Sequence, residues 1–71
     1  MPDVPGVLDV VALLADLPGE GLRRGQVGTV VEDLDRDAVL VEFSDEDGRA
    51  YAIVPVARTG LLALRYLPEA A

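Results

Sequence analysis

The sequence contains no cysteine and no histidine, and all six of its basic residues are arginines. Without thiol or imidazole groups the chain cannot form a disulfide, a zinc site of the usual ligands, or a triad with an imidazole base. Thirteen acidic residues give a formal net charge of −7, which disfavours general binding to nucleic acids or anionic lipids. We therefore expect no catalytic residues, no cofactor, no metal site and no small-molecule substrate.

Long hydrophobic runs are also missing. The longest apolar stretches, Val10 to Ala15 and Ala50 to Ala57, are far shorter than the roughly 20 residues that cross a bilayer. The first nine residues carry two aspartates, two prolines and no basic residue, unlike the positively charged start of a secretory signal. We therefore expect a cytoplasmic protein without a membrane partner. Its 71 residues predict a single domain over 1–71, with a core from about 8 to 68 and short flexible termini.

Glycine and proline divide the sequence into short runs, which is typical of an all-β domain. The run from Leu8 to Leu17 fits a helix or a strand equally well, and residues 16–25 predict a loop. Residues 26–33 are rich in β-branched side chains. Within them, Gly28 marks a place where a strand must bend sharply or admit another backbone, and we interpret the segment as a bent strand.

The segment from residue 38 to residue 54 predicts a β-hairpin. Residues 38–44 form its first strand, and Asp45 to Gly48 predict a type I turn closed by Gly48 in the left-handed conformation. Pairing Asp45 with Arg49 places two pairs of side chains on the core face and two pairs on the reverse face. The predicted core pairs are Phe43 with Tyr51 and Val41 with Ile53, and the predicted reverse-face pairs are Glu42 with Ala52 and Leu40 with Val54.

The remaining signals complete a five-stranded arrangement. Pro55 should end its strand or lie at a sheet edge, and Thr59-Gly60 predicts a bend. The last strand should run from Leu61 to Leu67 and stop at Pro68. Five such strands predict a small, mostly antiparallel and partly open barrel.

Three stretches carry a resemblance to a bacterial protein family. They are Asp16 to Glu32 (DLPGEGLRRGQVGTVVE), Val41 to Arg49 (VEFSDEDGR) and Leu61 to Pro68. Together they resemble the domain-of-unknown-function (DUF) 4926 family over roughly residues 8 to 69. The segment Gly25-x-x-Gly28-x-Val30 is also similar to the glycine-centred turn and strand of SH3-like and KOW-type barrels.

The family resemblance implies a five-stranded, SH3-like fold and a strand for the first run. It implies no reaction. Some members of the family are encoded beside toxin-like proteins, which suggests an accessory, immunity or antitoxin role for a neighbouring gene product.

Acidic residues offer two candidate sites, each with a simpler interpretation. Asp33, Asp35 and Asp37 alternate like the first ligands of a calcium loop, but Ala38 and Ser44 replace its required Gly and Glu. An acidic, solvated hairpin is therefore favoured, and weak binding of divalent cations stays open. The acids at 45–47 fit either a decoy for a basic protein surface or ordinary turn chemistry. A catalytic carboxylate pair would need a pocket, and we expect little room for a cavity of about 300 Å³.

Two features point to a macromolecular partner. Arg23 and Arg24 form the only adjacent basic pair and would contact phosphate in a KOW-like nucleic-acid module, or else pair with local acids. The runs 10–14 and 61–67 are apolar on both faces, so a protein partner, a homodimer or the chain's own terminal segments must cover one side. We therefore predict a protein-interaction module, with a KOW-like module as the alternative. The predicted partner-binding residues are Arg23, Arg24, Leu40, Val54, Leu61 and Leu62.

Overall fold

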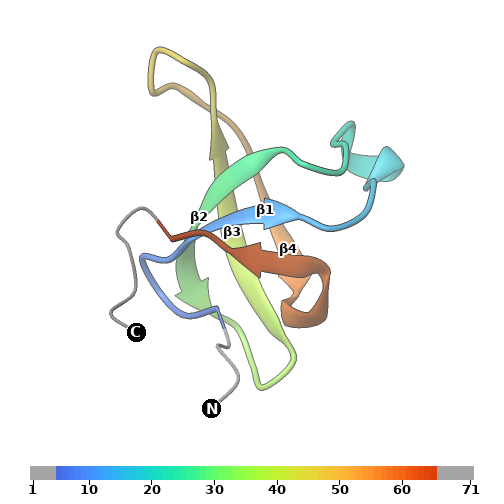
Figure 1. Ribbon diagram of the computed structural model, residues 1–71, viewed down its shortest axis with the longest axis vertical. Coiled ribbons are helices and arrows are strands. Elements are labelled where there is room, and N and C mark those ends of the chain that lie inside the picture. Colours follow the sequence, from blue (N-terminus) through green and yellow to red (C-terminus); the bar gives the residue numbers. More distant parts are fainter. Residues whose placement is uncertain (1–4, 66–71) are drawn as a thin grey trace.

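The computed structural model describes residues 5–65, and every regular element in that range is a strand or a single 3-10 turn (Figure 1). This confirms the all-β prediction and the choice of a strand for the first run. The last strand is shorter than predicted, and its expected end at Leu67 and Pro68 lies outside the described residues. The strands are β1 (Val10–Leu13), β2 (Val27–Asp33), β3 (Ala38–Ser44), β4 (Ala50–Ala57) and β5 (Leu61–Ala63), and the 3-10 turns are η1 (Pro18–Glu20) and η2 (Arg58–Gly60).

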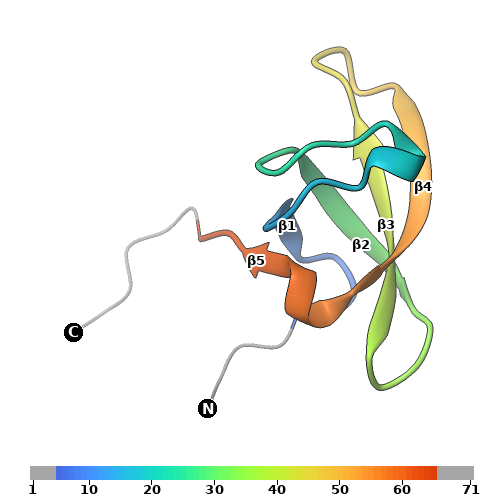
Figure 2. The ribbon, with the colours of Figure 1, turned by 90° about the vertical axis from the view of Figure 1, so that its right-hand side faces the viewer.

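All five strands belong to one antiparallel sheet in the order β4-β3-β2-β1-β5. The sheet curves so that β1 and β5 lie on one side and β3 and β4 on the other, with β2 shared between them (Figure 2). The sheet is not closed into a barrel, because no ladder joins β4 to β5. Pro55 lies within β4, an edge strand, where its missing N–H costs no bond to a sixth strand.

The core lies between the two sides of the curved sheet. β3 lies close to Gly28 of β2, since a Cβ at Gly28 would lie 2.7–2.9 Å from atoms of Val41, Glu42 and Phe43. This close approach accounts for the glycine, whereas the sequence favoured a bend in the strand as the reason for it. The buried hydrophobic side chains are Val11, Leu13, Leu22, Val30, Val39, Val41, Phe43, Val54, Val56 and Leu61.

The predicted hairpin register is correct at the turn and wrong beyond it. Asp45 N–H donates to the Arg49 carbonyl at 2.9 Å, and Gly48 has a φ of 79°, as the turn prediction requires. One residue further along, β4 has a bulge at Tyr51, so that Phe43 pairs with Ala52 and not with Tyr51. Because side chains alternate with a period of two, this one extra residue reverses the faces of the rest of β4.

Because of the bulge, the predicted core is wrong for three residues of β4. Tyr51 and Ile53, expected inside, are 50% and 53% exposed, whereas Val54, expected outside, is 6% exposed. A physical reason lies in the Tyr51 hydroxyl, which accepts a hydrogen bond from Gln26 Nε2 at 2.9 Å. Inside the core this hydroxyl would need a buried partner, whereas the bulge leaves it at the surface and turns valines inward.

A second bulge lies in β2 at Val31, between the pairs Val30–Val41 and Glu32–Leu40. Strict alternation would put Glu32 on the same face as the fully buried Val30. The extra residue turns Glu32 outward and returns Asp33 to the core side at the end of the sheet. The sheet thereby avoids burying an unpaired carboxylate in its middle.

Candidate protein-interaction surface

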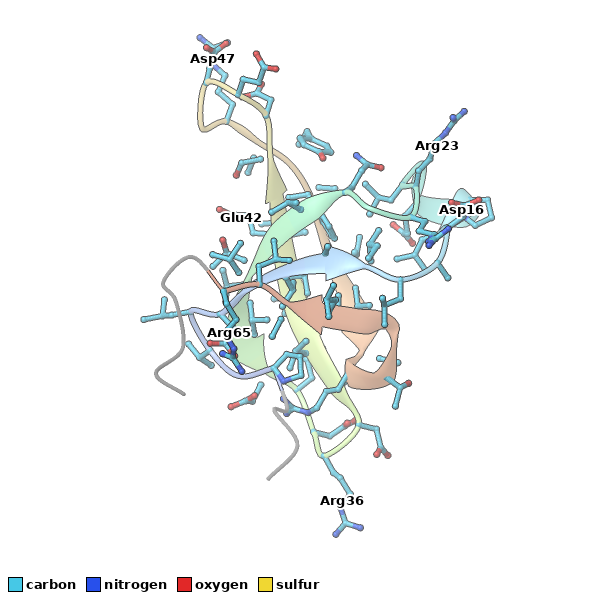
Figure 3. All side chains as sticks on the ribbon, in the orientation of Figure 1. Asp16, Arg23, Arg36, Glu42, Asp47 and Arg65 are labelled. Atoms are coloured by element: carbon cyan, nitrogen blue, oxygen red, sulfur yellow. The ribbon has the colours of Figure 1, made fainter. Side chains whose placement is uncertain are left out.

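The predicted site residues do not form one cluster. Arg23 and Arg24 are exposed in the long loop between β1 and β2, and Figure 3 shows Arg23 extending away from the sheet. The Arg24 backbone N–H donates to Asp16 Oδ1 at 2.8 Å, which fixes the loop backbone and leaves the guanidinium group outside that bond. Leu40 and Leu62 lie on the outer face of the sheet, on β3 and β5.

Val54 and Leu61 are not available to a partner. Each is 6% exposed and belongs to the hydrophobic core. For Val54 the cause is the bulge at Tyr51. For Leu61 the cause is its pairing with Leu13, which sends Leu61 inward and the next residue, Leu62, outward. The binding roles of Arg23, Arg24, Leu40 and Leu62 stay predictions.

An uncharged aliphatic surface lies on the outer side of β1 and its two neighbours. Ala12 pairs with Val27 of β2 on one side and with Leu62 of β5 on the other, so these three side chains form a row across the sheet. Two further residues of the same face, Val10 and Leu14, flank Ala12 along the chain. We name this surface the β1 face, and its residues are Val10, Ala12, Leu14, Val27 and Leu62.

The β1 face is substantially open to solvent. Leu14 is 46% exposed, Val27 45% and Leu62 52%, while Val10 and Ala12 are half-buried. Directly opposed side chains on neighbouring strands have Cβ atoms about 4.5–5.5 Å apart, so the row is continuous. Single exposed apolar residues are ordinary, but a contiguous aliphatic group without a charge is typical of an interaction site.

Charge is distributed unevenly around this face. Residues 27–60, which include all of β2, β3 and β4, hold eight acidic and three basic side chains, a net charge of −5. Residues 5–26 and 61–65 hold three of each and are neutral together. Figure 3 shows Asp47 at one end of the molecule and Arg36, in the other acidic turn, at the opposite end. Four of the five residues of the β1 face therefore belong to the neutral part of the chain, and the fifth, Val27, is the first residue of the acidic part.

Arg58 organises a polar cluster that the sequence analysis did not identify. Its side chain is 15% exposed, and its Nη2 lies 2.9 Å from Asp33 Oδ1 in a salt bridge. The same guanidinium donates to the carbonyl oxygens of Arg36 and Asp35, at 2.9 and 2.8 Å, and to that of Pro5. Arg58 thus joins the N-terminal segment, the β2–β3 turn and the end of β4.

The three alternating aspartates do not share a common centre. Asp33 faces Arg58, whereas Asp35 Oδ1 accepts the backbone N–H groups of Asp37 and Ala38 at 2.7 and 2.9 Å. Within residues 5–65, no three acidic side chains come close enough together to hold a metal ion. Asp45 acts in the same way at the hairpin tip, where its Oδ1 accepts N–H groups from Asp47 and Arg49. Both acidic turns are therefore arranged as backbone caps.

Two open hollows on the surface are larger than the sequence analysis expected. Each has a volume of about 560 Å³, against the expectation of little room for about 300 Å³. One lies beside Arg58, and the other lies inside the loop that carries Arg23 and Arg24. Their linings are Pro5, Arg36, Asp37, Ala57, Arg58, Thr59 and Leu61 for the first and Asp16, Pro18, Gly21, Leu22, Arg23 and Arg24 for the second.

Comparison with known proteins gives a family but no described relative. Among residues 5–65 there is no helix with the length and apolar character needed to cross a membrane. No curated protein and no solved structure matches the chain. One family model, described as "Domain of unknown function (DUF4926)", matches residues 7–63, which include all five strands. The chain therefore belongs to the DUF4926 family.

Proposed function

We propose that this protein is a non-enzymatic, acidic protein-interaction module that binds a protein partner through the β1 face. The observation that carries the proposal is the row Val27–Ala12–Leu62, an uncharged aliphatic surface on a chain of net charge −7. The centres of protein interfaces are depleted of charged residues in the same way. Binding would stabilise the complex, because it would remove the apolar area of the exposed side chains of the β1 face from water.

Other features support a binding role over catalysis. The sequence has no histidine and no cysteine, so the usual general base and the usual thiol nucleophile are absent. The carboxylates of Asp35 and Asp45 are occupied by backbone N–H groups, which suits a structural role. We also propose a cytoplasmic location, consistent with the absence of cysteine, and an accessory, immunity or antitoxin role for a neighbouring gene product.

A pull-down from the native host with a matched pair of variants tests this proposal. Leu62→Asp places a charge at the β5 end of the row, whereas Ile53→Asp places the same charge on the outer side of β4, at a residue of nearly equal exposure. We expect a protein partner to be retained by the wild type and by Ile53→Asp and lost by Leu62→Asp. The proposal fails if no partner is recovered or if both variants retain it equally.

A further inference from the structure

We infer that the β1 face is self-complementary and that a second copy of this chain is one of its partners, forming a symmetric dimer. The inference rests on the proposed function, because it assigns a partner to the same face. Three properties of the described residues carry it: the shape of the face, the distribution of charge, and the structure of the two sheet edges.

The β1 face has a short side chain at its centre and longer side chains around it. Ala12 ends at Cβ, and it is surrounded by four branched side chains, Val27 and Leu62 across the sheet and Val10 and Leu14 along the strand. In a two-fold interface the same patch contacts itself, so residue i of one copy meets residue j of the other and the reverse. Leu62, 52% exposed, is the side chain that would enter the space above Ala12 of the second copy.

The charge distribution favours this pairing over any pairing through the β3–β4 side. No residue of the β1 face is charged, so two copies joined by these faces would bring no carboxylate of the face against a carboxylate of the other copy. Pairing through the outer side of β3 and β4 would bring two segments of net charge −5 to about 10 Å from each other.

Pairing through sheet edges is disfavoured by the edges themselves. The Arg58 N–H bonds to the Asp37 carbonyl at 2.8 Å, so alternation along β4 directs the backbone of Pro55 away from β3 and toward the free edge. Proline removes the donor that an added strand would need there. The other edge, β5, offers only three residues. A second copy therefore docks face to face rather than edge to edge.

The size of the face predicts a weak dimer. Standard stable interfaces bury about 800 Å² per partner, which would be roughly 15% of the 5243 Å² surface of this chain. Five aliphatic side chains, two of them half-buried, form a smaller centre than that. We therefore expect a dissociation constant in the range of about 10 μM to 0.5 mM.

Sedimentation equilibrium of the full chain from about 5 μM to 1 mM, at about 150 mM salt, tests the inference. We expect reversible dimerisation of the wild type, at least a 30-fold rise in dissociation constant for Leu62→Asp and for Val27→Asp, and no more than a 3-fold change for Ile53→Asp. Leu62→Lys should weaken the dimer as strongly as Leu62→Asp, because the loss comes from burying a charge and not from its sign. Far-UV circular dichroism checks that each variant is folded. Because Leu62 lies on β5 and Val27 on β2, one of the two aspartate variants still tests the interface if the other does not fold.

Several outcomes would overturn the inference. A wild type that stays monomeric at 1 mM, equal weakening by Leu62→Asp and Ile53→Asp, or weakening by Ile53→Asp alone would each do so. If the wild type is monomeric but a host protein is still lost on Leu62→Asp, the proposed function stands and only the second copy is rejected. If the dimer forms and no host partner is recovered, the inference stands and the proposed function needs revision.

Discussion

Gly28 allows the most direct test of the packing described above. Its φ lies outside the left-handed region, so backbone conformation does not require glycine here. Close approach does, because a Cβ would lie 2.7 Å from Val41 Cγ1, 2.8 Å from the Glu42 carbonyl oxygen and 2.9 Å from Phe43 Cδ1. Two of these atoms belong to fully buried side chains and the third to the backbone of β3, so none can move cheaply.

The expected magnitude follows from two opposing effects. Adding a methyl group to a tightly packed site costs about 1–3 kcal/mol, and the reduced freedom of the unfolded chain returns about 0.4–1 kcal/mol. Gly28→Ala should therefore lower the free energy of unfolding by about 1–2 kcal/mol. With a urea m-value of about 1 kcal/mol/M for a domain of this size, the midpoint falls by about 1–2 M. Gly28→Val, with two more carbons, should prevent folding.

The matched control is Gly19→Ala. Gly19 lies in η1 and has no atom within 4 Å of the position where its Cβ would be, so its urea midpoint should equal or slightly exceed that of the wild type. Unfolding is followed by far-UV circular dichroism. The reasoning is refuted if Gly28→Ala unfolds within 0.3 M, roughly the error of the midpoint, of the wild type, or if both alanines lower the midpoint equally.

Three further changes test other parts of the structure. Phe43→Ala removes a fully buried ring at a cost of about 3–5 kcal/mol, a large part of the stability of about 4–10 kcal/mol for a domain of this length, so we expect the Tm to fall by at least about 12 °C; a Tm within about 5 °C of the wild type would contradict the burial. Arg58→Lys keeps the positive charge but loses the planar guanidinium group that makes several hydrogen bonds at once, so it should lower the Tm by about 8–16 °C. Arg36→Lys, the control, should leave the Tm unchanged, and equal Tm values for both variants would contradict the role of the Arg58 cluster. Gly48→Ala places a Cβ on a residue with left-handed backbone conformation and should lower the urea midpoint by about 1 M. Gly6→Ala is the control, because Gly6 does not have a positive φ and a Cβ there would meet no atom within 4 Å; equal midpoints for the two variants would disprove this account.

The local chemistry of turns was predictable from the sequence. The bounds of β3 and the turn after it match the prediction because their determinants lie within a few residues. The Asp45 side chain accepts two backbone N–H groups of the turn, and Gly48 supplies the positive φ. No contact with a distant part of the chain is needed for either.

The bulge at Tyr51 was not predictable in this way. From the turn alone, regular pairing and bulged pairing are equally possible, and the pattern of β4 supports both because its residues are apolar on either face. What distinguishes them is the tertiary structure. The Tyr51 hydroxyl reaches Gln26, which is 25 residues away, and Val54 and Val56 fill the core in place of Tyr51 and Ile53.

Arg58 shows the same limit for polar residues. As a single arginine after an apolar strand it has no sequence motif, and its partners are contributed by segments 22 to 53 residues distant. The bulge at Val31 brings Asp33 to the core side of the sheet, and the alternation of β4 brings Arg58 to the same end. A long-range cluster of this kind is visible only once two independent registers are known.

The outer surface gives the most instructive error, because the sequence indicated excess apolar surface on β1 and β5 but assigned Leu61 and Leu62 to it together. Neighbouring residues on a strand point to opposite faces, so only one of the two can be exposed. Both are leucines, and the sequence of β5 therefore has no preference between them. The pairing of Leu61 with Leu13, itself buried at 2% exposure, decides the choice and leaves Leu62 beside Ala12 on the β1 face. An interaction surface on a sheet that is apolar on both sides is thus set by cross-strand register, and a substitution that shifts β5 by one residue would exchange Leu61 and Leu62 between the core and the surface.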